Sequence, residues 1–195
     1  MMDTLPFTAI VLSGGESSRM KTEKGLVSFR GKAMIQHVLE TVSKVTNKVI
    51  LIANHPGYQK LGYPCFPDIF SGVGPLGGIY SGLIYSTTRK NLVLSCDMPF
   101  ITTQFLETFM NMAGEEDILV PVHEGKPQPL CAVYDQHCRE ELKARIGSGK
   151  LKLQDLFEAL KTKRVHVDSK FADASSIFTN INTPEDLIRY QNQKV

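Results

Sequence analysis

Short apolar runs and longer segments of helical period alternate along this chain. The short runs are rich in Val, Ile and Leu and are bounded by turn residues, which is typical of buried strands. In the longer segments apolar residues recur every three or four positions, as in amphipathic helices. This alternation predicts an α/β fold in which helices flank a mostly parallel sheet. The predicted strands are 7–13, 48–53, 92–95, 117–122 and 164–167, and the predicted helices are 33–45, 76–85, 103–113, 136–146, 151–160 and 184–193.

The length and composition fit one domain with a sizeable core, because the chain has 195 residues of which 42% are hydrophobic. Its sequence contains no linker, repeat or low-complexity tract, so a single domain over 1–195 is predicted. Residues 29–32 are expected to form a tight turn. Residues 127–134 are expected to form a further strand that borders the functional site. The sequence leaves open whether this strand runs antiparallel to the others.

The first candidate for chemistry is the loop after the first predicted strand, where residues 9–24 read AIVLSGGESSRMKTEK. Gly14 and Gly15 let the main chain turn sharply and approach a ligand closely, and exposed N–H groups in such a turn bind anions. Arg19 and Lys24 add cations suited to phosphate oxygens. A plain turn would also explain two adjacent glycines, but the basic residues favour a phosphate site. The loop itself contains neither GxxxxGK nor GxGxxG, the two better-known phosphate motifs.

A second candidate is Asp97, which follows the strand predicted at 92–95 and precedes Pro99. In an open parallel sheet, ligands bind beyond the carboxyl ends of the strands. A carboxylate at such a strand exit can hold Mg²⁺ against phosphate oxygens. The alternative is that Asp97 caps the next helix, but it lies too early in the chain, and Ile101 or Thr102 fits that position better. Asp97 is therefore the predicted metal ligand.

A second glycine cluster occupies residues 72–78, which hold four glycines. It precedes the helix that begins near Leu76, so it offers close approach to the backbone and the positive end of a helix. An ordinary flexible loop is the alternative reading, and these residues alone leave the two open.

The C-terminal segment 179–187 reads TNINTPEDL and contains a helix start. Thr183 is the expected N-cap, with Pro184 at the first helical position, and Asp186 lies where a longer Glu would complete a capping box. This explanation leaves out Asn180 and Asn182. Their alternate spacing would place both amides on one side of an extended segment.

Charge and cysteine content narrow the function further. The net charge is only +2, with basic and acidic residues interspersed, which argues against a nucleic-acid surface. The four cysteines have neither CxxC nor zinc spacing and are expected to be reduced, buried thiols. The sequence has no apolar run of membrane-spanning length and no signal-peptide pattern. A cytoplasmic protein that binds neither nucleic acid nor membranes is expected.

Four ordered segments resemble the molybdenum cofactor guanylyltransferases, the MobA family of nucleotidyltransferases on a Rossmann-like GT-A scaffold. They are VLSGGESSRM with Lys24, GVGPLGGI, CDMPF, and PQPLCAVY with NINTPEDL. Each segment alone is modest, but their order and spacing are specific and extend over nearly the whole chain. The first segment departs from the family pattern LAGGxSxRMGxDK twice. Ser13 stands where Ala is usual, and Lys-Thr-Glu-Lys at 21–24 stands where Gly-x-Asp-Lys is common.

The resemblance implies a role for each matching residue. Asp97 would hold the catalytic magnesium, Asp68 would contact the ribose or base, and Gly74 and Gly78 would be close-packing positions. One of the two asparagines would lie on the metal and substrate side, and we favour Asn182. Arg19, Lys24 and Asp97 are the expected catalytic residues. The residues expected around the nucleotide are Leu12, Ser13, Gly14, Gly15, Lys24, Asp68, Gly74, Gly78, Asp97, Asn180 and Asn182.

The implied reaction is transfer of GMP from GTP to the terminal phosphate of molybdopterin-bound molybdenum cofactor, with release of pyrophosphate. The second pKa of a phosphate monoester is about 6, so the attacking oxygen is already ionised and needs no general base. Main-chain donors of residues 12–15 would hold the triphosphate together with the two cations. The implied partners are GTP, the molybdenum cofactor, and proteins that deliver the cofactor or act as chaperones of molybdoenzymes.

Two alternatives stay open. One is a cytidylyltransferase acting on molybdopterin or on a sugar or polyol phosphate, because the residues give no physical basis for preferring guanine to cytosine. The other is a nucleotide-binding regulator without turnover. Asp97 argues against a regulator, since a site that only binds has less need of a metal carboxylate near Arg19 and Lys24.

Overall fold

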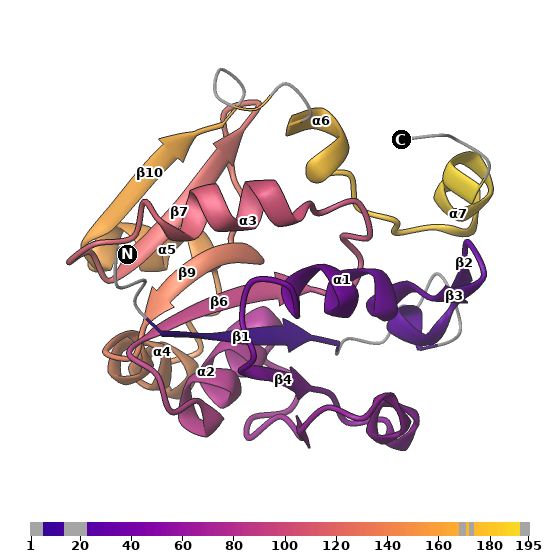
Figure 1. Cartoon of the computed structure of the whole chain (residues 1–195). Coiled ribbons are helices and arrows are strands. Elements are labelled where there is room, and N and C mark those ends of the chain that lie inside the picture. Colours follow the sequence, from indigo (N-terminus) through magenta and orange to yellow (C-terminus); the bar gives the residue numbers. More distant parts are fainter. Residues whose placement is uncertain (1–5, 14–22, 168–170, 172–173, 192–195) are drawn as a thin grey trace.

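The computed structural model of the chain describes residues 6–13, 23–167, 171 and 174–191. In it, helices cover both faces of a mixed sheet (Figure 1). Within the described residues the sheet has eight strands, in the order β10-β7-β9-β6-β1-β4-β5 with β8 paired to β7. They are β1 (Phe7–Leu12), β4 (Val49–Ile52), β5 (Cys65–Phe66), β6 (Lys90–Ser95), β7 (Ile118–His123), β8 (Lys126–Pro127), β9 (Cys131–Asp135) and β10 (Thr162–His166). A separate antiparallel hairpin pairs β2 (Ser28–Phe29) with β3 (Lys32–Ala33).

The helices connect these strands. They are α1 (Met34–Val42), α2 (Pro75–Tyr85), α3 (Thr103–Met110), α4 (Cys138–Gly147), α5 (Leu153–Ala159), α6 (Ala174–Ile177) and α7 (Pro184–Gln191), with the 3₁₀ segments η1 (Lys24–Leu26) and η2 (Pro56–Leu61). Within the described part of the chain, none of these helices is long and apolar enough to cross a membrane.

The strand order reverses at β1. This strand pairs in parallel with β4 on one side and with β6 on the other. Strand β9 runs antiparallel to both β6 and β7, so β6 and β7 have the same direction. In an open α/β sheet, the ligand crevice lies beyond the carboxyl ends of the strands at such a switch point. The topology therefore directs attention to Leu12 and Ser95, where β1 and β6 end.

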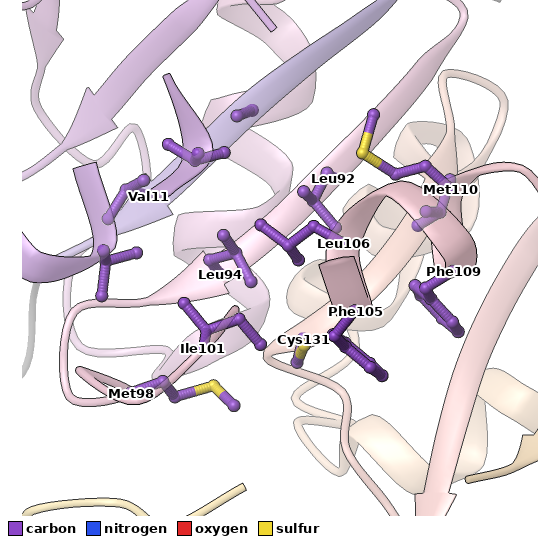
Figure 2. Close-up of a cluster of buried hydrophobic side chains, with 14 of the residues drawn as sticks. Val11, Leu92, Leu94, Met98, Ile101, Phe105, Leu106, Phe109, Met110 and Cys131 are labelled. Atoms are coloured by element: carbon purple, nitrogen blue, oxygen red, sulfur yellow. The ribbon is translucent and has the colours of Figure 1, made fainter. Parts of the chain in front are cut away.

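Alternate residues of β1 pack into two hydrophobic layers. Ala9 and Val11 belong to the layer on the side of α1 and α3, and Ile10 belongs to the layer formed with α2, α4 and α5. Figure 2 shows the first layer, to which Leu106 of α3 and Leu92 of β6 both belong. Burying one side chain of this size stabilises a fold by about 1.5–3 kcal/mol. The two layers together hold the central strands from both faces.

The predicted fold class and the long elements are confirmed. The five predicted strands correspond to β1, β4, β6, β7 and β10, and the six predicted helices to α1 to α5 and α7. The segment 127–134 is divided between β8 and β9, and β9 is antiparallel. The tight turn at 29–32 is also confirmed, since Arg30 and Gly31 have φ angles of 49° and 83°. The single-domain organisation stays a prediction.

Some boundaries were wrong, and short elements were missed. The helix predicted over 33–45 ends at Val42, and its first residue belongs to β3. The helix predicted over 136–146 begins only at Cys138. The sequence did not indicate β5, η2 or α6, which are two, six and four residues long. Segments this short carry too few periodic positions for a pattern to be recognised.

One helix contact gives a stability prediction. A Cβ atom at Gly82 of α2 would lie 2.4 Å from Cγ2 of Ile10, so Gly82→Ala should overpack this contact and lower the free energy of unfolding by about 1–3 kcal/mol. Urea denaturation measures the change. Gly147→Ala in α4 is the matched control, because a Cβ there meets nothing within 4 Å. Equal stability of the two variants would contradict the close approach of α2 to β1.

Candidate functional site

A cavity of about 950 Å³ opens at the carboxyl ends of β1, β4 and β6. Leu12, Ile52 and Ser95, the last residues of these strands, all line it. The cavity therefore occupies the crevice at the switch point of the sheet, where ligands bind in folds of this type.

Most of the predicted site residues lie around this cavity. Asn180 is exposed and is not among the residues that line the cavity, whereas Asn182 lines it. That both amides lie on one side of the segment stays a prediction. Gly14, Gly15 and Arg19 lie outside the described residues. The predicted residues that line the cavity are Leu12, Ser13, Lys24, Asp68, Gly74, Gly78, Asp97 and Asn182.

Lys24, Asp97 and Asn182 form a connected group, although they come from η1, from the loop after β6 and from the segment before α7. Lys24 Nζ forms an ion pair with Asp97 Oδ2 and donates a hydrogen bond to Asn182 Oδ1 at 2.6 Å. The side chains of Lys24 and Asp97 are only 16% and 14% exposed. The pair is thus largely shielded from water, where charge interactions are stronger than at the surface.

Three buried polar atoms around the cavity have no hydrogen-bond partner among the described residues. They are Ser13 Oγ, Asp68 Oδ1 and Asp97 Oδ1. Buried polar atoms in native proteins are nearly always paired, so each unpaired one needs an explanation. Since all three line one cavity and two are carboxylate oxygens, a ligand or cation in this cavity would satisfy them.

Asn54 holds the Asp68 carboxylate in place. The Asp68 N–H donates to Asn54 Oδ1 at 3.0 Å, and Asn54 Nδ2 donates to Asp68 Oδ2 at 3.4 Å. The other oxygen, Oδ1, has no partner in the described part of the chain and is available to a ligand. Burial raises the pKa of Asp68 above its ordinary value, against the opposing effect of the Asn54 hydrogen bond. A hydrogen-bond donor on a ligand would favour the ionised carboxylate.

The two predicted close-packing glycines differ. A Cβ at Gly78 would lie 3.3 Å from both δ carbons of Leu12 and 3.7 Å from Asp68 Oδ1, so this glycine does keep the floor of the cavity open. A Cβ at Gly74 would meet nothing within 4 Å, so close packing is the wrong reason for that residue. Gly74 instead has φ 63° and ψ −150° at the N-cap of α2, a conformation that is essentially restricted to glycine.

At the end of β1, the main-chain N–H of Ser13 does not have the predicted role. The Ser13 N–H donates to the Ile52 carbonyl at 2.9 Å. This amide is used within the sheet and is not free for a phosphate oxygen, so the predicted donor role of the Ser13 main chain is corrected.

Neighbouring Cys96 is buried, and burial together with the Asp97 charge raises its pKa to about 12, as expected for a thiol without a nucleophilic role.

Sequence patterns did not indicate Tyr58, which lies in η2 and is buried against the cavity. Its hydroxyl donates to Glu23 Oε2 at 3.2 Å, and burial raises its pKa, so it stays a donor. A Cβ at Gly25 would lie 2.8 Å from this hydroxyl and 2.5 Å from Ser13 Oγ. Tyr58 thus supports the short η1 segment that carries Lys24. Asn54 was also missed, although it follows β4 just as Asp97 follows β6.

The helix caps were predicted with one error. Thr102 accepts a hydrogen bond from the Phe105 N–H and caps α3 as expected. At α7, Thr183 Oγ1 accepts from the Asp186 N–H, and Asp186 Oδ2 accepts in return from the N–H groups of Thr183 and Asn182 at 3.0 Å. A longer Glu is therefore unnecessary, because Asp186 already completes the reciprocal cap.

The remaining predictions concern metals and thiols. Within the described residues no group of three His, Cys, Asp or Glu side chains could hold a metal ion. All four cysteines are free, and Cys96, Cys131 and Cys138 are buried as expected, whereas Cys65 is partly exposed.

The fold and the cavity define a Rossmann-like α/β protein whose ligand site lies at the carboxyl edge of its sheet. Residues 9–165 match the family model described as MobA-like NTP transferase domain. The chain therefore belongs to this family of nucleotidyltransferases, as its motifs predicted.

Similar proteins agree with this membership. The chain is 36% identical to a probable molybdenum cofactor guanylyltransferase of Flavobacterium johnsoniae, over 95% of this chain and 96% of the relative. It is 33% identical to a molybdenum cofactor guanylyltransferase of Vibrio campbellii, over 93% of both chains. Among solved structures it resembles molybdopterin-guanine dinucleotide biosynthesis protein A of Archaeoglobus fulgidus, with a TM-score of 0.81 and 30% identity, covering 94% of this chain and 96% of the other.

Proposed function

We propose that this protein transfers GMP from GTP to the terminal phosphate of molybdopterin-bound molybdenum cofactor and releases pyrophosphate. The names of its full-length relatives support the substrates. The structural observation that carries the proposal is the cavity at the switch point. There a shielded Lys24 pairs with Asp97, and the carboxylates of Asp97 and Asp68 each present one buried oxygen without a hydrogen-bond partner among the described residues.

The chemistry is a displacement at the α-phosphorus of GTP. An oxygen of the acceptor phosphate forms a bond to this phosphorus while the bond to the bridging oxygen of the β-phosphate breaks, so that pyrophosphate leaves. The acceptor phosphate is already ionised near neutral pH. The protein therefore has to align the two substrates and neutralise charge, without removing a proton.

Among the described residues that line the cavity, Lys24 is the cation that would neutralise the charge of the triphosphate. Asn182 and Asp97 hold its ammonium group in the cavity, so the charge is oriented before the triphosphate arrives. Preoriented charges stabilise a transition state without reorganisation during the reaction. Arg19 and the main chain of Gly14 and Gly15, which lie outside the described residues, are proposed to complete the phosphate contacts.

Mg²⁺ is the cofactor we propose, with Asp97 as its protein ligand. The fit rests on Asp97 Oδ1, a buried carboxylate oxygen without a hydrogen-bond partner among the described residues. Mg²⁺ prefers oxygen ligands and keeps several waters and phosphate oxygens, so one or two protein oxygens suffice. When bound, the ion would offset the negative charge of the phosphates.

Asp68 is proposed to select the base, together with Leu12 and the open floor at Gly78. Asp68 Oδ1 has no hydrogen-bond partner among the described residues. The N1–H and amino group of guanine present two adjacent donors to such a carboxylate, whereas cytosine presents one amino donor next to an acceptor. A site that pairs with particular ring groups rejects bases that lack them, because its own polar atoms are then left unpaired.

This proposal predicts base selectivity, which calorimetry can measure with GTP, CTP, ATP and UTP in the presence of Mg²⁺. GTP is expected to bind at least roughly 100-fold more tightly than CTP, and Asp68→Asn is expected to narrow the difference. Pyrophosphate release with molybdenum cofactor as acceptor then tests turnover. Equal or tighter binding of CTP would indicate a cytidylyltransferase, and tight GTP binding without pyrophosphate release would indicate a regulator.

We place this reaction in the cytoplasm, with proteins that deliver the cofactor and molybdoenzyme chaperones as further partners. The free state of all four cysteines supports a reducing compartment.

A further inference from the structure

The C-terminal helix α7 is poorly anchored for an element that contributes to the cavity. None of its residues is fully buried. Yet the segment just before it contacts both charged residues of the site. Asn182 Oδ1 accepts from Lys24 Nζ at 2.6 Å, and the Ile181 N–H donates to the Asp97 carbonyl at 3.1 Å. The place of α7 therefore bears directly on the geometry of Lys24.

Arg30, in the turn of the β2–β3 hairpin, donates three hydrogen bonds to this helix. Its Nε and Nη2 donate to the Tyr190 carbonyl at 3.2 and 2.9 Å, and its main-chain N–H donates to Gln191 Oε1 at 3.3 Å. The guanidinium carbon also lies 5.1 Å from the ring centroids of both Phe29 and Phe100. A cation at the carboxyl end of a helix interacts favourably with the helix dipole.

The apolar contacts of α7 lead to the same hairpin. Phe29, Met34, Phe100 and Ile181 form a small buried cluster, against which two residues of α7 pack. One of them, Tyr190, packs edge-on against Phe100, with the two ring centroids 5.6 Å apart. Figure 1 shows α7 beside β2 and β3, away from the faces of the main sheet. The hairpin is therefore the platform on which the C-terminal helix rests.

We infer that Arg30 is a positioning residue that acts through Asn182. By docking α7 onto the hairpin, it sets Asn182 Oδ1 against Lys24 and keeps the ammonium group aimed into the cavity. Arg30 itself lies in the hairpin turn and does not line the cavity. The inference rests on the proposed GMP transfer, because that reaction gives the position of Lys24 its importance.

The docking itself can be measured without any assay of activity. In Arg30→Gln, amide hydrogen exchange of the peptide covering 179–191 should accelerate by about tenfold, since local opening then costs less. Lys32→Gln is the matched control, because Lys32 lies in the same hairpin but pairs with Glu40 of α1. The control should exchange like the wild type over 179–191. Equal exchange in both variants would overturn the docking role.

A double-mutant cycle tests the link to Asn182. Arg30→Gln alone is expected to lower the kcat for pyrophosphate release by roughly five- to tenfold, and to have less than about a twofold effect when Asn182 is already Ala. Arg30→Lys should restore activity only in part, because an ammonium group lacks the planar fork of a guanidinium. If Arg30→Gln unfolds at a much lower temperature than the wild type, Arg30→Lys is used in its place in the cycle. Independent, multiplicative effects of the two substitutions would overturn the inference.

The two proposals fail in different ways. If the wild type releases no pyrophosphate from GTP with molybdenum cofactor, the proposed function is wrong, and hydrogen exchange still shows whether Arg30 docks α7. If the wild type is active and Arg30→Gln loosens α7 without changing kcat, the function stands and the positioning role is wrong.

Discussion

Asp97→Asn is expected to lower the kcat for pyrophosphate release by about 100-fold or more, which is comparable to losing one strong electrostatic stabiliser. The substitution keeps the size of the side chain but removes its charge. Asp97 Oδ2 pairs with Lys24, and Asp97 Oδ1 is the oxygen we assign to the metal. Both the aim of the ammonium group and the anchoring of the cation therefore depend on this carboxylate. GTP affinity should fall less, because the phosphate contacts proposed for Lys24, Gly14 and Gly15 would remain.

Steady-state pyrophosphate release across a magnesium titration measures this effect, with circular dichroism to confirm the fold. Asp155→Asn is the matched control, since Asp155 is exposed in the first turn of α5. The control should behave like the wild type. Turnover of Asp97→Asn within a few-fold of wild type at low magnesium would exclude Asp97 as the metal ligand.

The predictability of the fold depended on the length of each element. Helices such as α1 and α3 have apolar residues at helical spacing and were located from that pattern alone. Strand β9 was located as a strand, but its antiparallel direction depends on pairing with β6 and β7, which are distant in sequence. Strand β5 pairs through two residues only. Its position is set by tertiary contact with β4 and not by local propensity.

The site was predictable where a residue directly follows a long strand or belongs to a recognised motif. Asp97 and Lys24 met these conditions, and the structure brings them into contact. Tyr58 met neither, because η2 has no periodic pattern and the contact with Glu23 joins residues 35 positions apart. Asn182 lines the cavity and Asn180 does not, a difference that their shared place in one motif did not indicate.

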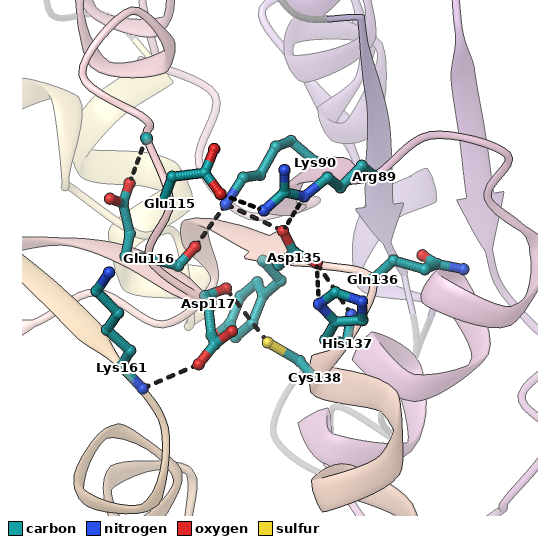
Figure 3. A network of polar contacts seen from close by, with 12 residues as sticks. Arg89, Lys90, Glu115, Glu116, Asp117, Asp135, Gln136, His137, Cys138 and Lys161 are labelled. Carbon is teal, nitrogen blue, oxygen red and sulfur yellow. Dashed lines mark hydrogen bonds and ion pairs between the residues drawn. The ribbon is translucent and has the colours of Figure 1, made fainter.

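A second group of charged residues lies at the other end of β6, away from the cavity, and it stabilises the fold. Figure 3 shows Lys90, at the start of β6, beside Asp135, at the end of β9. Their side chains are only 2% and 1% exposed, and Lys90 Nζ lies 3.1 Å from Asp135 Oδ2. Arg89 Nε adds a contact to Asp135 at 2.9 Å, and the His137 N–H donates to it at 3.1 Å. Lys90 also donates to the Glu116 carbonyl, so the ammonium group is fully inside the protein.

Asp135→Asn is therefore expected to lower the free energy of unfolding by about 3–5 kcal/mol, because it leaves a buried ammonium group without its counter-charge. Urea denaturation near neutral pH measures the loss. Glu115→Gln is the matched control, since Glu115 pairs with the same Arg89 at 2.8 Å but is 76% exposed. An exposed pair of this kind contributes at most about 1 kcal/mol. Equal losses in the two variants would show that Asp135 contributes no more than a surface charge.

The pH dependence of the same loss separates charge from shape. Burial raises the pKa of Asp135, but hydrogen bonds from the His137 N–H and the Lys90 ammonium outweigh this effect and hold it below the ordinary value. A carboxyl group with a lowered pKa stabilises the fold fully above its unfolded pKa of about 4, and this contribution disappears as the pH falls through the folded value. The stability difference between wild type and Asp135→Asn should thus be constant from about pH 8 to pH 5 and narrow in stronger acid. A difference that persists unchanged at low pH would mean that Asn disturbs the packing between β6 and β9, and that the charge of Asp135 is not what stabilises this edge.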